Sequence, residues 1–292
     1  MNKNIKKIIV TGSAGFIGFS LCLKLLGRGD NIVGIDNQNN YYDPKIKKAR
    51  VQILSKYPNY KHYLSDITDQ NSLNRIFKES NPEIVVNLAA QAGVRYSMEN
   101  PLAYINSNVL GFLHILENCR HYKVKHLVYA STSSVYGANT KMPFSEHDSV
   151  NHPLSLYAAS KKSNELMAHT YSHLYDLPVT GLRFFTVYGP WGRPDMAPMK
   201  FTKSILNKQP IDIYNNGDLS RDFTYIDDII EGIYRCCFKP ATIIKNKMSY
   251  SLAPYRVFNI GNGKPIKLMD FINLLEKKLD MKAVKNFLPM QQ

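Results

Sequence analysis

Cysteine is scarce in this sequence, which limits what the protein can be. The four cysteines are Cys22, Cys119, Cys236 and Cys237, and no C-x-x-C pair occurs among them. This spacing argues against a disulfide framework or a cysteine-based zinc site, and free thiols fit a reducing cytoplasm. Apolar runs near the ~18 residues of a membrane span are lacking too, and no charged-then-apolar leader precedes the first predicted strand. We therefore expect a soluble cytoplasmic protein that does not enter a membrane.

Acidic residues are also few: 23 Asp and Glu stand against 37 Lys and Arg, a formal net charge of +14. The basic residues are scattered, apart from short groups at 3–7, 45–50 and the C-terminal end. No helix pattern carries clustered arginine, so nucleic acid is not expected and a small anionic ligand is. A hydrophobic content of 44% over 292 residues predicts a globular chain of about two domains.

A glycine-rich turn is the first chemical signal. The apolar run Lys7–Thr11 is followed by Gly12, Gly15 and Gly18, and then by an apolar-periodic stretch at 19–26. Strand, glycine turn and helix in this order predict a turn whose backbone approaches the diphosphate of a dinucleotide.

A carboxylate at the end of the next predicted strand, 31–36, strengthens this interpretation. Asp36 lies 18 residues after Gly18, close to the ~20 expected for a ribose-binding acid. An acid there repels a 2′-phosphate, and Asn37 follows it rather than an arginine, so NAD is favoured over NADP. The alternative is an ordinary turn beside an ordinary surface Asp, and the order of the two features makes it the weaker one.

Strands and helices alternate along the first part of the chain. Further strands are predicted at 60–64, 84–90, 126–131 and 179–185, and helices at 71–79 and 102–122. This alternation predicts an α/β fold with a Rossmann-like, doubly wound parallel sheet, whose ligands lie beyond the carboxyl ends of the strands. The residues expected there are Asp66, Ile67, Ala89, Ala90, Gln91, Ser131 and Thr132.

The second part of the chain has a different texture. Residues 190–194 read Pro-Trp-Gly-Arg-Pro, and short alternating pieces such as 211–214 follow. We predict an NAD-binding Rossmann domain at 1–180, to which 223–240 returns, and a smaller C-terminal substrate-binding domain at 181–292.

Thr132, Tyr157 and Lys161 form the predicted chemical centre. The i, i+4 spacing places Tyr157 and Lys161 on one face of a helix. A tyrosine with an ordinary pKa of ~10 is a poor base, but a nearby ammonium and a positively charged nicotinamide favour the phenolate. An isolated Tyr-x-x-x-Lys is more often a plain amphipathic face. After a dinucleotide turn and a strand that ends in Ser-Thr, it predicts proton transfer at a sugar hydroxyl.

These motifs together resemble those of the extended short-chain dehydrogenases/reductases. Within that family the sequence is most similar to the nucleotide-sugar epimerases, and among these to the UDP-glucuronate 4-epimerases. The similarity runs from about Lys7 to Met290 and is most specific at 186–195. The segments that carry it are YYDP at 41–44, AAQAGVRYS at 89–97, SLYAASK at 155–161, GLRFFTVYGPWGRPD at 181–195, RDFTYIDD at 221–228 and FNIGN at 258–262.

The resemblance implies conversion of UDP-glucuronate to UDP-galacturonate through a transient 4-keto sugar, with NAD regenerated in each turnover. Tyr157 would take the proton of the 4-hydroxyl, Thr132 would assist at that oxygen, and Lys161 would bind the nicotinamide ribose and lower the pKa of Tyr157. The cofactor-binding residues implied are Gly12, Gly15, Phe16, Ile17, Gly18, Asp36, Asn37, Asp66, Ile67, Ala89, Ala90, Gln91, Ser131, Tyr157 and Lys161.

A uronic acid adds a constraint, because its 4-ketone is a β-keto acid that loses carbon dioxide once the carboxylate leaves the carbonyl plane. Ser133, Ser134, Thr186 and Arg193 offer donors that can hold that carboxylate, although loop caps and a surface Arg are the plain alternative. Related dehydratases and decarboxylases carry acids where Ser133 and Ser134 stand, which favours epimerisation. The implied substrate-binding residues are Arg95, Ser133, Ser134, Thr186, Arg193, Tyr214 and, for the diphosphate, Arg221.

Glu165, His169 and His173 recur every four residues on the same predicted helix. No other ligand set points to them, so no metal site is expected. The apolar positions of this helix and of 102–116 fit core packing or, as in dimers of the family, pairing across a two-fold axis. We expect a homodimer.

The C-terminal end departs from the family pattern. Family members continue past a segment like Leu288–Gln291 into a Pro-Gly-Asp turn and a final helical stretch, whereas this sequence stops at Gln292. We therefore expect a substrate-binding domain that is truncated at its C-terminus. Two alternatives stay open: a C4-epimerase of another UDP-sugar, or an inactive truncated protein that binds a nucleotide sugar or NAD. UDP-galacturonate, the product that the resemblance implies, is suited to polysaccharide biosynthesis.

Overall fold

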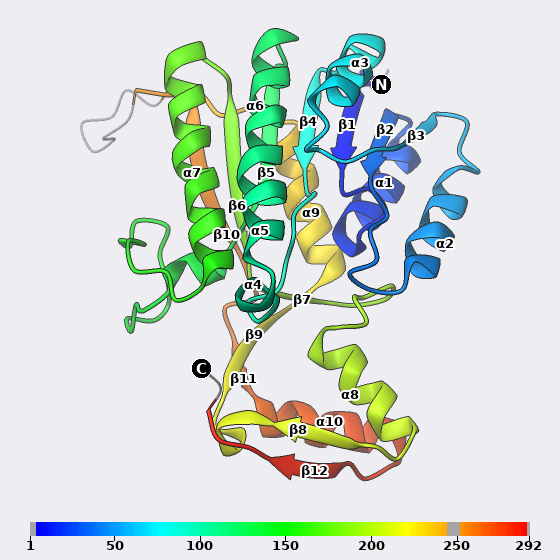
Figure 1. Ribbon diagram of the computed structural model, residues 1–292, viewed down its shortest axis with the longest axis vertical. Coiled ribbons are helices and arrows are strands. Elements are labelled where there is room, and N and C mark those ends of the chain that lie inside the picture. Colours follow the sequence, from blue (N-terminus) through cyan, green and yellow to red (C-terminus); the bar gives the residue numbers. More distant parts are fainter. Residues whose placement is uncertain (1–3, 244–251, 291–292) are drawn as a thin grey trace. The chain divides into compact units, whose positions relative to one another are not determined.

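The structure is a computed structural model that describes residues 4–243 and 252–290 (Figure 1). The chain forms two compact units. The first unit contains Met1–Phe184 and Asp227–Ile260, and the second contains Phe185–Ile226 and Gly261–Gln292. Residues 291 and 292, on which the expected truncation depends, lie outside the described residues.

A seven-stranded parallel sheet forms the centre of the first unit. The strands follow one another in the order β10-β6-β5-β4-β1-β2-β3, and every neighbouring pair is parallel. Strand order reverses direction on either side of β1, which is the doubly wound arrangement, so the predicted Rossmann-like fold is confirmed. The bounds are β1 (Lys7–Thr11), β2 (Asn31–Asp36), β3 (Tyr60–Leu64), β4 (Ile84–Asn87), β5 (His126–Thr132), β6 (Val179–Phe184) and β10 (Tyr255–Ile260).

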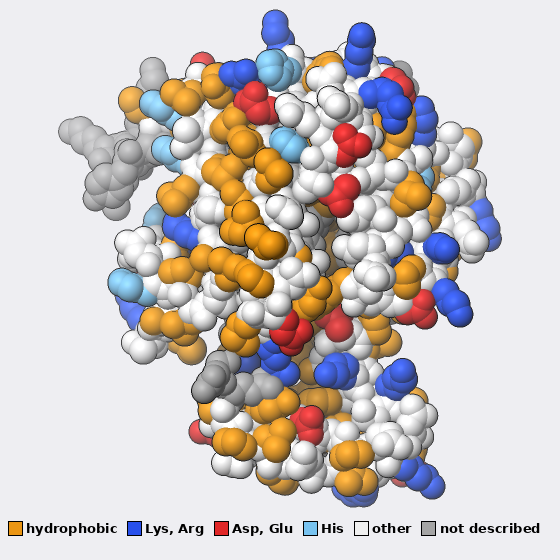
Figure 2. Space-filling view, in the orientation of Figure 1, with side chains coloured by type: hydrophobic (Ala, Val, Ile, Leu, Met, Phe, Trp, Pro, Cys, Tyr) orange, Lys and Arg blue, Asp and Glu red, His pale blue; other side chains and the backbone are white. Residues whose placement is uncertain are grey.

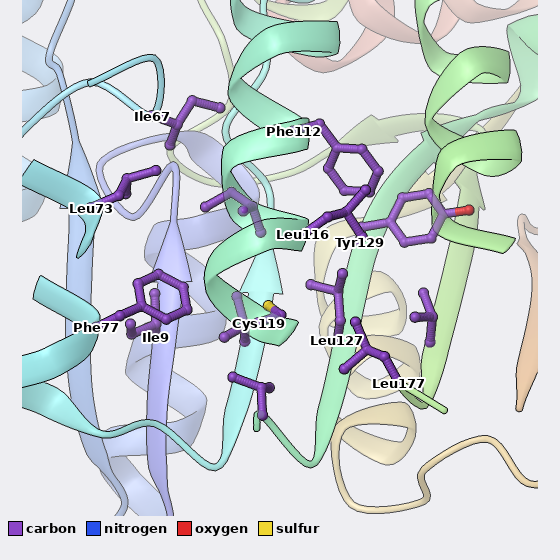
Figure 3. Packing of buried hydrophobic residues seen from close by; sticks show 14 of the residues in the cluster. Ile9, Ile67, Leu73, Phe77, Phe112, Leu116, Cys119, Leu127, Tyr129 and Leu177 are labelled. Carbon is purple, nitrogen blue, oxygen red and sulfur yellow. The ribbon is translucent and has the colours of Figure 1, made fainter. Parts of the chain in front are cut away.

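Helices cover both faces of this sheet. Apolar residues of α3, α6 and α7 pack on one face, together with Ile9, Val85, Leu127 and Tyr129 from the strands (Figure 3). In Figure 1, α9 lies on the opposite face, where Lys24 of α1 pairs with Glu231 of α9 at 3.0 Å. The helices of this unit are α1 (Phe16–Arg28), α2 (Pro44–Leu54), α3 (Gln70–Ser80), α4 (Tyr96–Glu99), α5 (Pro101–Tyr104), α6 (Gly111–His121), α7 (Leu156–Tyr175) and α9 (Ile226–Cys237), with a π-helix η1 (Ile105–Leu110) and a 3-10 helix η2 (Ser133–Tyr136).

Burial of these side chains drives the fold. The central strands β1 and β4 are nearly continuous buried runs because both faces of the sheet are covered there, and β4 has four buried residues in succession. Each fully buried Leu, Ile or Phe contributes about 1.5–3 kcal/mol through removal of apolar surface from water. The carboxyl ends of β1, β4 and β5 are thereby fixed next to one another.

Two predicted elements differ from the structure, and one strand was not predicted. The stretch 102–122 is not one α-helix but α5, η1 and α6 in series. The strand predicted at 84–90 ends at Asn87, where Asn87 accepts a hydrogen bond from the hydroxyl of Thr11 at 2.6 Å. Strand β10, next to β6, was missed because its alternation is no stronger than that of other surface segments.

The division into units also differs in detail from the predicted boundaries. Residues 181–184 belong to β6 and therefore to the first unit rather than to the second. The returning segment runs from Asp227 to Ile260 and so includes β10, whereas the sequence indicated 223–240. Helix α9, Ile226–Cys237, lies within the predicted returning segment 223–240.

The second unit combines short strands with two helices. Strand β9 lies between β7 and β11 in a three-stranded sheet, and β8 pairs with β12 in parallel. A small core of Ile205, Ile211, Ile213 and Ile272 holds the helices on these strands. The bounds are β7 (Thr186–Tyr188), α8 (Ala197–Leu206), β8 (Pro210–Ile213), η3 (Tyr214–Gly217), β9 (Ser220–Tyr225), β11 (Pro265–Lys267), α10 (Leu268–Leu279) and β12 (Val284–Phe287).

One carboxylate ties β12 to α10. Glu276, 4% exposed, accepts hydrogen bonds from the ammonium of Lys285 at 2.5 Å and from the backbone N–H of Ala283 at 3.0 Å. These donors, with Lys282, lower the pKa of Glu276 to about 2 from an ordinary value of 4.5.

This pKa makes a prediction about acid stability. Because the folded-state pKa lies below the unfolded one, the stabilisation is complete above about pH 5 and is lost as the pH falls toward 2. We expect Glu276→Gln to lower the unfolding temperature at pH 7, and the difference from the unchanged protein to shrink between about pH 5 and pH 2. Thermal unfolding followed by circular dichroism measures it; a difference that is constant over this range would contradict the role of the carboxylate.

Candidate active site

The glycine turn between β1 and α1 is built for close backbone approach. Gly12 has φ +67°, and a Cβ there would lie 2.8 Å from the backbone nitrogen of Ala89. A Cβ on Gly18 would lie 2.1 Å from the carbonyl oxygen of Gly12. Gly15 is the N-cap of α1, and no side chain bonds the first N–H groups of the helix from that position. The first turn also contains no acidic residue. The N–H groups of Phe16 and Ile17 therefore start a helix suited to an anion.

Asp36 holds the turn from the end of β2. Its carboxylate accepts hydrogen bonds from the N–H of Ala14 at 3.0 Å and from the N–H of Gln38 at 2.8 Å. The carbonyl of Ala14 accepts a hydrogen bond from buried Arg50 at 2.8 Å. Both backbone polar groups of Ala14 are thus hydrogen-bonded beside a carboxylate at the end of β2, which fits an adenosine ribose without a 2′-phosphate.

Asn37 and Asp66 continue this edge. The Asn37 amide donates to the Asp66 carboxylate at 2.6 Å, and Thr68 donates to it from both its backbone N–H and its hydroxyl. Partial burial acts to raise the pKa of Asp66, but these donors outweigh it and hold the pKa below its ordinary value. Ile67 beside it is buried.

The segment after β4 is fixed by a residue that the sequence interpretation missed. Asn108, in η1, is 1% exposed. Its amide accepts from the N–H of Gln91 at 2.8 Å, and donates to the carbonyl of Gln91 at 3.0 Å and to the hydroxyl of Ser160 at 2.9 Å. Ala89 donates its N–H to the hydroxyl of Thr11 at 3.1 Å. A polar Asn inside an apolar-periodic helix pattern was the available signal.

Thr132 ends β5 and begins η2. It is 7% exposed, and its hydroxyl accepts the N–H of Ser134 at 3.2 Å and donates to the hydroxyl of Ser134 at the same distance. This cap fixes Ser133 and Ser134 in the first turn of η2, directly beyond the carboxyl end of β5. The structure thus brings three of the predicted hydroxyl donors into one turn.

Helix α7 presents Tyr157 and Lys161 one turn apart, after Ser155 caps it with a 3.1 Å bond to the N–H of Ala158. The Tyr157 ring is half-buried and meets the buried ring of Tyr104 edge-on at 6.0 Å between centroids. Lys161 is 2% exposed. Burial lowers the pKa of its ammonium to about 8, although the charge of Glu165 acts in the opposite direction.

The remaining predicted substrate residues fall in different places. Arg95 is exposed before α4 in the first unit. Thr186 starts β7, Tyr214 starts η3, and Arg221 is an exposed residue of β9 in the second unit. Arg193 of the second unit binds Asp195 through two hydrogen bonds of 3.1 and 2.5 Å.

The three residues at metal-like spacing on α7 have other partners. Glu165 forms a 2.8 Å ion pair with Arg183, which the sequence interpretation did not identify. The rings of His169 and His173 stack at 6.5 Å between centroids. Within 4–243 and 252–290 there is no group of three or more His, Cys, Asp or Glu placed to hold a metal ion. In the same ranges no helix is both long and apolar enough to cross a bilayer.

A glycine turn before α1, a carboxylate at the end of β2, Thr132 at the end of β5, and Tyr157 with Lys161 on α7 are together typical of a nucleotide-dependent oxidoreductase. Residues 8–261 match the model of the NAD dependent epimerase/dehydratase family. The chain belongs to that family, and NAD is its cofactor.

Several relatives cover nearly the whole chain. Protein CapI of Staphylococcus aureus is 55% identical over 98% of this chain and 87% of its own length. A probable UDP-glucuronate 4-epimerase of Rhizobium meliloti is 48% identical over 98% of this chain and 86% of its own length. Among solved structures, UDP-glucuronic acid 4-epimerase from Bacillus cereus, in complex with UDP-glucuronic acid and NAD, has a TM-score of 0.85 and 35% identity over 97% of this chain and 86% of that one.

Proposed function

We propose that this protein inverts C4 of UDP-glucuronate to give UDP-galacturonate, through a transient 4-keto sugar. The observation that carries the proposal is that Thr132 ends β5, while α7, which packs against β5 and η2, presents Tyr157 and buried Lys161 one turn apart in a chain of the NAD dependent epimerase/dehydratase family. The relatives named for UDP-glucuronate support the choice of substrate.

The residues of the first unit suit a reversible proton transfer. Tyr157 takes the proton from the sugar 4-hydroxyl and returns it, while the ammonium of Lys161 favours its phenolate. Thr132 turns its hydroxyl hydrogen from Ser134 to the same sugar oxygen and keeps that oxygen in line with Tyr157. Bound NAD supplies the acceptor, and then the donor, of the C4 hydride. The glycine turn with Phe16 and Ile17 holds the diphosphate of NAD, and Asp36 holds its adenosine ribose.

Control of the substrate carboxylate follows from its chemistry. The β-keto acid keeps its carbon dioxide only while the carboxylate stays near the carbonyl plane, so hydroxyl donors must fix it. Ser133 and Ser134 lie in the turn that Thr132 caps and supply such donors without an acid that would promote elimination. Thr186 and Arg193 are the proposed contributors from the second unit, with Tyr214, Arg221 and Arg95 at the nucleotide.

Incubation with UDP-glucuronate and NAD, followed by chromatographic separation of the sugar nucleotides, tests the proposal. We expect UDP-galacturonate to accumulate, with no UDP-pentose formed by decarboxylation. If no epimer forms, the proposal is wrong.

UDP-glucose, added in competition, separates the proposal from a C4-epimerase of neutral sugars. We expect UDP-glucuronate to be preferred, because Arg193 can bind its carboxylate.

We also propose that the protein acts as a cytoplasmic homodimer whose product enters polysaccharide biosynthesis. The four cysteines are unpaired, which fits a reducing compartment. Apolar side chains gather over α5 to α7 in Figure 2. Exposed leucines of these elements are Leu102 of α5, Leu110 of η1, and Leu166 and Leu174 of α7. A monomer rarely leaves such a contiguous face uncovered, and a second copy of the chain can cover it across a two-fold axis. Sedimentation equilibrium should give a two-chain mass and, for Leu166→Arg, a one-chain mass; a one-chain mass for both would contradict the dimer.

A further inference from the structure

A buried carboxylate outside the catalytic set connects its members. Glu165 of α7 is 3% exposed and forms two hydrogen bonds with Arg183 of β6, at 2.8 and 2.9 Å. Its Oε1 also accepts the hydroxyl of Ser131 at 2.7 Å. Ser131 precedes Thr132 on β5, and Glu165 follows Lys161 by one helical turn. One side chain therefore reaches the strand that carries Thr132 and the helix face that carries Lys161.

The same cluster extends to η2. Arg183 donates from its second terminal nitrogen to the phenol of Tyr136 at 3.0 Å, and Tyr136 donates to Asn259 of β10 at 2.7 Å. Asn259 in turn donates its backbone N–H to the carboxylate of Glu146 at 2.7 Å. Tyr136 closes the 3-10 turn that begins with Ser133 and Ser134. The orientation of η2 is thus linked to the same ion pair.

We propose that Glu165 is a positioning residue for epimerisation, which acts on Thr132 through Ser131 and on Lys161 through its charge. The proposal rests on the function proposed above. The established sequence pattern of Thr, Tyr and Lys does not include this carboxylate, and its ion pair with Arg183 is not exposed to screening by salt.

The charges around Lys161 explain why the carboxylate matters. On α7 itself, the nearby titratable residues are Tyr157 and Lys162, and η1 contains no titratable residue. The titratable residues on the other elements packed against this part of α7 are Tyr104 of α5, Tyr129 of β5, Tyr136 of η2, Arg183 of β6 and Tyr255 of β10. Farther along, Tyr171 of α7 bonds Glu117 of α6, while Glu99 of α4 is exposed.

Glu165 supplies the negative charge that reaches Lys161. Burial raises the pKa values of Tyr129 and Tyr255, so both stay neutral, and Arg183 stays positive. Burial also acts to raise the pKa of Glu165, but Arg183 and Ser131 outweigh it, so the carboxylate stays ionised. Loss of that charge makes the ammonium of Lys161 less stable, and the alkaline limit of activity moves to lower pH.

Glu165→Gln tests this in the full-length protein with NAD bound. The alkaline limb of kcat should start near the pKa of Lys161, about 8, in the unchanged protein and move down by about one pH unit in the variant. We expect kcat at neutral pH to fall by about tenfold, with KM for UDP-glucuronate nearly constant. Glu165→Asp keeps the charge, so it should keep the limb while kcat falls.

A matched control and a second variant separate positioning from folding. Glu83→Gln removes a carboxylate that pairs with Lys6 and Lys125 at the amino end of β4, and should leave the pH profile unchanged. The double variant Glu165→Met, Arg183→Met replaces the whole ion pair by apolar side chains. It should therefore fold, and it replaces Glu165→Gln in the test if that variant does not fold. If Glu165→Gln or the double variant is folded and has the pH profile and turnover of the unchanged protein, the proposal is overturned.

A measurement of Lys161 titration that needs no turnover separates the test of Glu165 from the test of the proposed function. The chemical shift of the ¹³Cε of Lys161 reports its titration in lysine-labelled protein, with the signal assigned by its loss in Lys161→Met. We expect the midpoint to fall in Glu165→Gln by about one unit whether or not UDP-glucuronate is the substrate. Absence of epimerisation in the unchanged protein would overturn the proposed function alone. An unshifted midpoint would overturn the role of Glu165.

Discussion

Replacement of Tyr157 by Phe should lower kcat for epimerisation by about 10²- to 10⁴-fold, the usual contribution of a positioned acid–base group. The substitution removes the phenol oxygen and keeps the ring, which meets Tyr104 edge-on at 6.0 Å, so the fold of α7 should persist. KM for UDP-glucuronate should change little, because the lost interaction belongs to the transition state. Initial rates of UDP-galacturonate formation measure the effect.

Lys161→Met provides the companion experiment. Because Lys161 acts through Tyr157, the double variant should lose about as much activity as Tyr157→Phe alone, rather than the product of the two losses. NAD binding, followed by quenching of protein fluorescence, should survive Tyr157→Phe. A Tyr157→Phe protein that epimerises at the normal rate would show that another group moves the proton.

Replacement of Gly18 by Ala should weaken NAD binding. The added Cβ would lie 2.1 Å from the carbonyl oxygen of Gly12 and 3.0 Å from the Cα of Ser13, and both are backbone atoms that no side-chain rotation can move. The turn must open, which costs about 1–3 kcal/mol of unfolding free energy. A displaced turn no longer offers its N–H groups to the diphosphate, so affinity for NAD should fall by about tenfold or more. Calorimetric titration with NAD measures it.

The same helix offers the control. A Cβ added to Gly27 of α1 would come within 4 Å of no neighbouring side chain or strand among the described residues, so Gly27→Ala meets no obstacle. It should raise the unfolding free energy by up to about 1 kcal/mol, since Ala is the better helix former, and should leave NAD affinity unchanged. Equal NAD affinities in the two variants would contradict the packing role of Gly18.

The dinucleotide half of the site could be predicted from the sequence because its signals are local. Gly15 and Gly18 owe their identity to the carbonyl of Gly12 in the same turn, and Gly12 itself has a positive φ. Asp36 reaches Ala14 from a strand that is adjacent in both sequence and sheet. The spacing of Tyr157 and Lys161 was sufficient to place both on one helix face, while their proposed chemistry depended on the glycine turn and the Ser-Thr strand end before them. The alternation of strands and helices along the chain was sufficient to predict the parallel sheet.

The polar network beneath the site could not be predicted, since its partners are distant in sequence. Asn108 meets Ser160 across 52 positions, and Tyr136 meets Asn259 across 123. The π-helix around Asn108 interrupts a pattern that looks like one continuous α-helix, so periodicity alone gave the wrong element. Glu165 was visible at helical spacing from Lys161, but its partner Arg183 becomes adjacent only once β5 and β6 pair.

Conversion of UDP-glucuronate that carries deuterium at C4 tests the central claim most directly. If Tyr157 moves only the hydroxyl proton and the C4 hydrogen returns to the same sugar, proton NMR should show UDP-galacturonate with deuterium retained at C4 and no decarboxylated sugar. Loss of the deuterium to water, or absence of the epimer, would contradict the account.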